Sequence, residues 1–217
     1  KWKNNSENIK IKPYFKSDNI IVGRIARNEP SKWNYLLLAT MMEIKKRGCI
    51  NKFKFIFLGM PKPYKIFLKI FFRKEIKTNR ILFLAESSDD EKLSKVYKTL
   101  DVFYQTSWIG ESFGCVIAES FAHKKPVMAD FNKSIKINNK INEKLYDAQS
   151  ELVDHKVNGY VTSNPQSAAN YLINTNKETL TKMGENGYEK ALNRYEVNTI
   201  TTNFENILEN LVLNKNN

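Results

Sequence analysis

The sequence predicts an α/β domain in which helices cover both faces of a parallel sheet, followed by a tail of helices. Short apolar runs alternate with segments of helical periodicity, two of these runs end in glycine, and the pattern becomes all helical after residue 163. Such alternation favours a parallel sheet, because each parallel connection must cross the sheet and usually does so as a helix. With 217 residues, 41% of them hydrophobic, the chain can bury a core of this kind.

The predicted strands are short and mostly apolar: residues 19–23, 53–59, 80–84, 101–105 and 126–129. The predicted helices cover residues 31–47, 89–100, 114–123, 177–192 and 198–213, with one more opening at Asn164-Pro165. The Asn- and Lys-rich segment 130–148 predicts an inserted loop with a short helix. We therefore expect three parts: a polar linker from a missing N-terminal domain (1–18), the α/β domain (19–197) and a C-terminal helix (198–217).

Composition sets broad limits on partners and location. The net charge of +12 is explained either by compositional drift or by an anionic partner, such as a phosphate-bearing ligand or a membrane surface. The lysines are scattered and no nucleic-acid-binding motif is present, so nucleic acid is not an expected partner. Cys49 and Cys115 show no metal or redox spacing, and no apolar run approaches the roughly 20 residues that span a bilayer. We expect a cytoplasmic protein, with peripheral membrane contact as an open alternative.

The loop after the strand at 101–105 carries the strongest chemical signal. Ligands of open α/β sheets bind outside the carboxyl ends of the strands, and here Glu111 precedes a Gly-containing turn while Glu119 lies on the helix beyond it. The turn would present backbone N–H groups and the positive end of a helix dipole to a phosphate. The pattern indicates a ligand that is anionic in the middle and polyhydroxylated at both ends, as a nucleotide sugar is. The structural alternative is a capping Glu111 and a solvated Glu119.

Around these two glutamates the sequence resembles family 4 of the retaining glycosyltransferases. Glu111 and Glu119 have the family's E-x7-E spacing and its Glu-x-Phe-Gly turn, and the segment after them leads to Pro126-Val127 as in the family. Four further stretches resemble the family in the same order: Ile21-Val-Gly-Arg-Ile25, Phe57-Leu-Gly59, residues 90–103 and residues 147–160. The resemblance covers about residues 19–205, and the joint match is far more specific than any single motif.

The resemblance implies a GT-B architecture, in which two Rossmann-like domains face each other across a cleft. This chain matches the C-terminal, donor-binding domain, which has a Rossmann-like parallel sheet. By the same resemblance, Arg24 and Lys32 hold the diphosphate of the donor. Arg24 matches the family position directly, whereas Lys32 lies eight positions further on, which an insertion at 26–30 accounts for. Trp33 stands where the family has Gly.

The remaining donor-site residues also follow from the resemblance. Glu111 should contact the transferred sugar and Glu119 the ribose, while backbone N–H groups of residues 112–115 face the sugar and the distal phosphate. The residues expected to bind the donor beside Arg24, Lys32 and Glu111 are Gly23, Leu84, Ala85, Glu86, Ser112, Phe113, Gly114, Cys115, Glu119, Gln149 and Glu151. Residues 84–86 should lie near the base, and residues 149 and 151 should help to close the site. Neither a metal nor a cofactor is expected, because the two basic residues and the N–H groups neutralise the leaving diphosphate.

The expected function is transfer of a hexosyl group from a UDP- or GDP-sugar to a glycan, lipid-linked or protein acceptor, with retention at the anomeric carbon. Acceptor groups should come largely from the missing domain, so the chain alone is expected to bind the donor without transferring it. Two alternatives remain. One is a nucleotide-sugar epimerase on the same scaffold, and the other is a non-catalytic module that binds nucleotide sugars or docks on a membrane.

Three other features have mainly structural interpretations. Asp89 and Asp90 stand where a helix begins and predict capping rather than metal binding. His123 and His155 have no companions at ligand spacing, and we expect both to be structural. Segment 62–77 predicts a helix with an aromatic face (Tyr64, Phe67, Leu68 and Phe71) and a basic one. Packing on the sheet is favoured there over lying on an anionic membrane.

Overall fold

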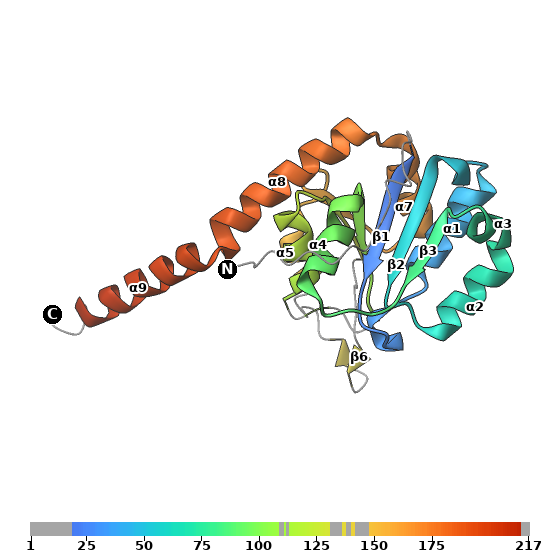
Figure 1. Cartoon of the computed structure of the whole chain (residues 1–217). Helices are drawn as coiled ribbons and strands as arrows, with labels where there is room; N and C mark the ends of the chain where they lie inside the picture. Colours follow the sequence, from blue (N-terminus) through green and yellow to red (C-terminus); the bar gives the residue numbers. More distant parts are fainter. Residues whose placement is uncertain are drawn as a thin grey trace.

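The computed structural model describes residues 19–108, 111, 113–130, 136–137, 140–141 and 148–213. Its main sheet has six parallel strands in the order β3-β2-β1-β4-β5-β8 (Figure 1). The strands are β1 (Ile20–Ile25), β2 (Phe53–Leu58), β3 (Ile81–Leu84), β4 (Val102–Gln105), β5 (Val127–Ala129) and β8 (Gly159–Val161). A separate antiparallel hairpin pairs β6 (Lys136–Ile137) with β7 (Lys140–Ile141).

Helices cover both faces of this sheet, which confirms the predicted fold class. One face carries α1 (Leu36–Lys46), α2 (Lys62–Phe71), α3 (Arg73–Lys77) and α7 (Pro165–Asn174) over a core rich in aromatic rings. The other face carries α4 (Asp90–Thr99), α5 (Cys115–Ala122) and α8 (Lys177–Tyr195), and its core is mainly aliphatic. The short α6 (Ala148–Leu152) leads into β8. Strands buried on both faces explain the near-continuous apolar runs in the sequence.

Helix α8 packs against α5 at unusually close range. A β-carbon at Gly184 would overlap the carbonyl oxygen of Lys124, just beyond the end of α5, and one at Gly187 would overlap the ring of Phe121. These two glycines form the seam between the helices, because no larger residue fits at this separation. After α8, α9 (Val197–Leu213) extends away from the body of the domain (Figure 1). None of the helices in the described ranges is both long and apolar enough to cross a membrane.

Several element boundaries differ from the sequence prediction. The first strand runs to Ile25, so Gly23 lies inside it. The helix predicted at 31–47 is instead a 3-10 turn (Pro30–Lys32) followed by α1, whose first turn begins where the Asn34 side chain accepts a hydrogen bond from the Leu36 N–H (2.8 Å). The helix predicted at 62–77 breaks at Phe72. Edge strand β8 was not predicted, because only three residues pair there.

The expected linker at 1–18 and most of the insertion predicted at 130–148 lie outside the described residues.

Candidate active site

The site expected from the sequence lies at the carboxyl ends of β1 and β4. Connections from β1 lead toward β2 and β3 on one side, whereas those from β4 lead toward β5 and β8 on the other. Adjacent strands whose connections diverge leave a crevice above their carboxyl ends, where open α/β sheets bind ligands. Strand β1 ends at Ile25 and β4 at Gln105, so the loops after these two residues flank the place where the topology predicts this crevice.

Arg24 is the buried centre of this region and is only 1% exposed. Its NH1 group donates to Gln105 and to the carbonyl of Ile25, and NH2 donates to the carbonyls of Lys32 (2.6 Å) and Thr106 (2.7 Å). Burial lowers the pKa of Arg24 to about 10, and the nearby Glu111 carboxylate opposes that shift, so the guanidinium is charged at neutral pH. The Arg24 guanidinium, which the resemblance assigned to the diphosphate, is turned into the interior in this structure and fastens the loop after β1 to the loop after β4.

Lys32 and Glu111 meet at the edge of the crevice, as the sequence led us to expect for two residues of one site. The Lys32 Nζ atom lies 3.1 Å from Glu111 Oε2, with the two side chains 28% and 15% exposed. The other carboxylate oxygen of Glu111 accepts a hydrogen bond of 3.0 Å from the Gln105 amide. Glu111 is thus held on both oxygens, and Lys32 stays partly open to solvent.

Gly114 sets the entry into α5. Its φ of 79° lies in the left-handed region that glycine adopts without strain, and no side chain caps the helix. The capping role considered for Glu111 is therefore wrong, since its oxygens are taken by Lys32 and Gln105. The first N–H groups of a helix have no acceptor within that helix, and here they begin at the exposed Cys115. Phe113 is exposed and meets the ring of Tyr195 edge-on, whereas Ser112 lies outside the described residues.

Glu119 lies on the exposed side of α5 and is oriented by a buried tyrosine. The Tyr97 hydroxyl, from α4, donates to Glu119 Oε2 over 2.8 Å. Burial first, and then the Glu119 carboxylate, raise the pKa of Tyr97 well above its usual value, so the phenol stays protonated as a donor. Glu119 is solvated, as one interpretation held, but its direction is fixed.

The other expected residues divide between loops and core. Glu86 joins the loops after β1 and β3, because its Oε2 atom accepts a hydrogen bond of 3.0 Å from the Asn28 N–H. Ala85 beside it is exposed. The Leu84 carbonyl accepts a hydrogen bond from the Gly59 N–H. Gln149 is buried on α6, whereas Glu151 is exposed there and its carbonyl accepts from Lys190.

Gly23, expected among the donor-binding residues, lies inside β1. A β-carbon there would overlap the Leu100 side chain, so packing also accounts for this glycine.

The family model for "Glycosyl transferases group 1" matches residues 17–177, most of the chain. The chain belongs to this family.

Solved structures share the fold of this chain. HepE from Anabaena, in a complex with UDP, superposes with a TM-score of 0.63 at 25% identity, over 89% of this chain and 49% of that one. The C-terminal domain of the group 1 protein LpcC from Francisella tularensis gives 0.59 at 19% identity, over 82% of this chain and 87% of that domain. TarM from S. aureus gives 0.64 at 22% identity, over 89% and 36%. No curated protein matches the chain.

These likenesses identify the fold as that of the Rossmann-like C-terminal domain of GT-B glycosyltransferases. The group 1 chain spans about half the length of the HepE structures that it matches.

Two polar residues that connect the loops of this site, Gln105 and Asn34, were not predicted from the sequence. Gln105 connects buried Arg24 to Glu111, and Asn34 donates to Asp130 and, over 3.4 Å, to the carbonyl of Ser107. The signal that could have revealed these contacts is a polar residue at or just after the carboxyl end of an apolar strand. Gln105 ends β4, and Asp130 directly follows β5.

The structural interpretations of Asp89 and of the two histidines are confirmed. Asp89 caps α4 by accepting from the Lys92 N–H (2.8 Å). His123 stacks on Tyr97 and contacts Ser94 Oγ, while His155 accepts from the Val161 N–H and contacts the Tyr171 hydroxyl. Within the described ranges, no three His, Cys, Asp or Glu side chains gather as a metal site would require.

Proposed function

We propose that the chain is the donor-binding domain of a retaining glycosyltransferase that uses a nucleotide diphosphate sugar. The observation that carries this proposal is the Lys32–Glu111 pair, held at the β1–β4 crevice next to the left-handed Gly114 that opens α5. A cation, a carboxylate and free helix N–H groups are thereby presented at one edge of the sheet. This combination suits a ligand with a diphosphate bonded to a sugar.

In this function, the diphosphate lies between Lys32 and the amino end of α5. The ammonium of Lys32 and the first N–H groups of the helix neutralise the charge that grows as the sugar–phosphate bond breaks. Arg24 does not touch the phosphate in this scheme; it fixes the backbone of Lys32 and the side chain of Gln105. Because these groups supply positive charge, the proposed reaction requires no metal.

The two glutamates bind the hydroxyls at the two ends of the donor. Glu111 accepts from the transferred sugar and Glu119, held by Tyr97, accepts from the ribose. Residues 84–86 lie near the base, and the segment from Gln149 to Glu151 closes the site. Neither glutamate is assigned as the acceptor's base. The acceptor is a glycan, lipid-linked or protein molecule, and the groups that bind it come from another domain. This chain alone therefore binds the donor and transfers nothing.

Uridine is the first base to test, because HepE, at 25% identity, is seen with UDP; a GDP-sugar is the second. Titration calorimetry of the chain with UDP, GDP and their sugars should give a Kd of about 0.1–1 mM for one nucleotide. Lys32→Met should weaken that binding at least about ten-fold through loss of a charged hydrogen bond.

The matched control is Lys98→Met, which removes an exposed lysine from α4. Its affinity should equal that of the wild type. Absence of binding by every nucleotide at millimolar concentration, or equal weakening by the two substitutions, would contradict the proposal.

A further inference from the structure

Helices α2 and α3 present an unusual outer surface. On the inner side, α2 buries Tyr64 and Leu68, and Phe72 follows at the same spacing of four residues. A helix anchored along this line turns its opposite side to solvent. That side includes residues between the buried Tyr64, Leu68 and Phe72. A helix that covers the edge of a sheet normally has polar side chains there.

Large apolar side chains occupy this outward side instead. Ile66 is 47% exposed, Ile70 is 65% exposed and Phe71 is 47% exposed. Phe71 was expected on the inner face with Tyr64, but it is half exposed and lies next to the ring of Phe67 (4.7 Å between centroids). One exposed apolar residue is ordinary for a soluble protein, but three within two helical turns form a patch that water disfavours.

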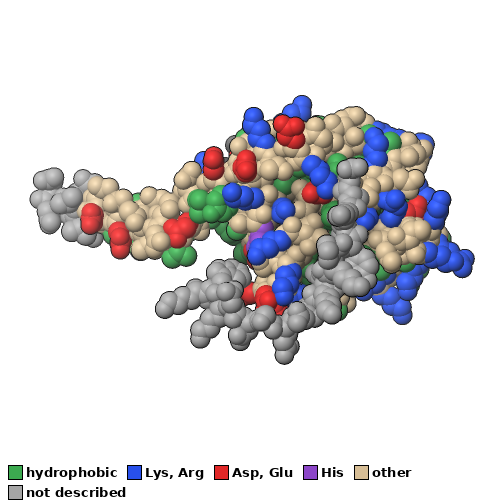
Figure 2. All heavy atoms as spheres, turned by 45° about the horizontal axis from the view of Figure 1, so that its top comes forward, with side chains coloured by type: hydrophobic (Ala, Val, Ile, Leu, Met, Phe, Trp, Pro, Cys, Tyr) green, Lys and Arg blue, Asp and Glu red, His purple; other side chains and the backbone are tan. Residues whose placement is uncertain are grey.

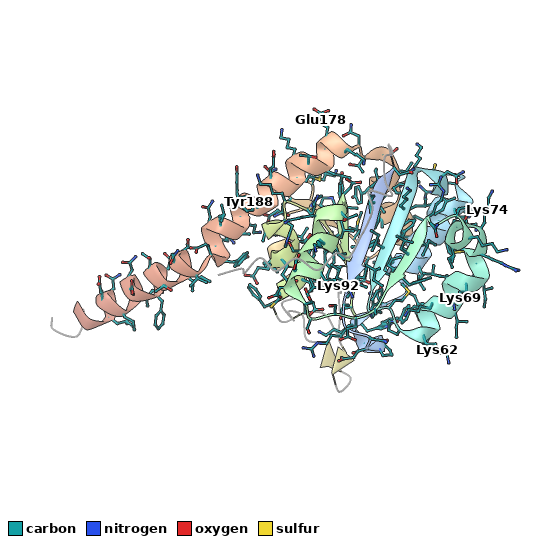
Figure 3. All side chains as sticks on the ribbon, viewed as in Figure 1. Lys62, Lys69, Lys74, Lys92, Glu178 and Tyr188 are labelled. Carbon is teal, nitrogen blue, oxygen red and sulfur yellow. The ribbon has the colours of Figure 1, made fainter. Side chains whose placement is uncertain are left out.

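Basic side chains surround the patch. Lys62, Lys69, Arg73 and Lys74 are exposed, and Figure 3 shows the three labelled lysines among them along the outer side of α2 and α3. Figure 2 shows lysine and arginine side chains predominating at this end of the molecule. Glu75 is the one acidic residue in the sequence of the two helices, and it is buried against Lys45 of α1. The surface of α2 and α3 therefore offers only positive charge.

We propose that this outer face of α2 and α3 docks the protein on an anionic lipid bilayer. Lysines attract the negative surface of the membrane while apolar side chains between them enter the boundary of the acyl chains, which is how amphipathic helices lie in an interface. A soluble acidic partner would satisfy the lysines but leave Ile66 and Ile70 unexplained. The bilayer satisfies both, and it does so without any helix that spans it.

The position of α2 connects this surface to the crevice. Strand β2 ends at Leu58 and α2 begins at Lys62, so the amino end of the helix lies at the carboxyl edge of the sheet. Tyr64 of α2 stacks on Tyr35 (4.9 Å), and its hydroxyl accepts from the Trp108 indole N–H (3.1 Å) in the loop that leads to Glu111. Docking through α2 holds the edge that carries the site near the membrane. This inference does not depend on the proposed function.

Co-sedimentation of the chain with vesicles tests the proposal. The chain should bind vesicles made of equal parts phosphatidylglycerol and phosphatidylcholine, and not vesicles of phosphatidylcholine alone. Replacing Lys62, Lys69 and Lys74 by Gln should lower the partition coefficient about 100-fold, at about 1 kcal/mol for each lysine. Ile66→Ser with Ile70→Ser should lower it about ten-fold, because part of the binding is apolar insertion.

A control variant separates this face from the overall charge. Gln in place of Lys92, Lys98 and Lys182 removes the same charge from α4 and α8, on the other side of the sheet, and should weaken binding by no more than about three-fold. All substituted side chains lie outside the core, and circular dichroism checks the fold of each variant. Absence of binding to anionic vesicles, equal loss for the two lysine triples, or no effect of the isoleucine pair would each overturn the proposal.

Discussion

Two lysine–glutamate pairs in this molecule have the same length and different surroundings. Lys32 and Glu111 lie 3.1 Å apart at the carboxyl edge of the sheet, and Lys45 and Glu75 lie 3.1 Å apart between α1 and α3. In the second pair, Lys45 contacts both oxygens of a glutamate that is only 5% exposed, and it also donates to the Phe71 carbonyl. In the first pair, Lys32 takes one oxygen and Gln105 takes the other.

The difference separates an ion pair that holds helices together from one that is available to a ligand. The Lys45–Glu75 pair satisfies a buried charge, so losing either partner leaves an uncompensated group. The Lys32–Glu111 pair is open on its lysine side and braced from behind by Gln105 and buried Arg24. An anion can therefore bind Lys32 without disturbing the fold. We expect substitutions in the Lys32–Glu111 pair to affect donor binding and turnover, and substitutions in the Lys45–Glu75 pair to affect stability.

The largest expected effect is on turnover. Glu111→Gln in the full-length protein should lower kcat/KM for the donor about 100-fold, because the carboxylate that orients both Lys32 and the sugar is lost. Thermal stability should change little. Glu75→Gln is the matched change in the other pair and should leave turnover within about two-fold. Equal turnover for Glu111→Gln and the wild type would remove the distinction between the pairs.

The second effect is on stability. Lys45→Met should lower the free energy of unfolding by about 2 kcal/mol, because the Glu75 carboxylate stays buried without its cation. Urea denaturation of the chain measures it. Lys32→Met, at the exposed edge, should cost no more than about 0.5 kcal/mol. The comparison fails if the two substitutions destabilise the chain equally.

The smallest expected effect is on nucleotide-sugar affinity, through the Gln105 side chain that holds Glu111 in place. Gln105→Glu keeps an acceptor for Arg24 but removes the amide that donates to Glu111, so stability should hold to within about 1 kcal/mol while nucleotide-sugar affinity falls about ten-fold. Calorimetry and urea denaturation of the same variant measure both quantities. A loss of stability without a loss of affinity would show that Gln105 serves only to neutralise Arg24.

The order of strands and helices was predictable because it depends on local patterns. Apolar runs such as residues 53–58 read directly as strands buried on both faces, and α4, α5, α8 and α9 begin and end within a few residues of their predicted bounds. Strand β8 was missed because its pairing is nonlocal: Gly159 pairs with Val127, and three residues give no periodicity of their own. The 3-10 turn at 30–32 was missed for a similar reason, since its place depends on contacts with the loop after β4.

For the candidate site, some neighbours could be predicted from the sequence but their contacts could not. The family resemblance assigned Lys32 and Glu111 to one site, and in the structure these two side chains form an ion pair. The side chain of Arg24 was assigned to the ligand, but two carbonyls and an amide bind it in the interior. Whether an arginine at a strand end points outward depends on which acceptors the adjacent strand supplies. Gln105 on β4 is separated from Arg24 by 81 positions, so no local pattern reveals it.

The glycine seam between α5 and α8 has a mechanical consequence. With backbone against backbone at Gly184 and a ring against backbone at Gly187, the two helices have no layer of flexible side chains in which to slide past each other. The seam holds the carboxyl end of α5 against α8, the helix from which α9 extends away from the sheet (Figure 1). A larger side chain at Gly184 or Gly187 would have to push the two helices apart, and would thereby shift the helix whose amino end follows Gly114.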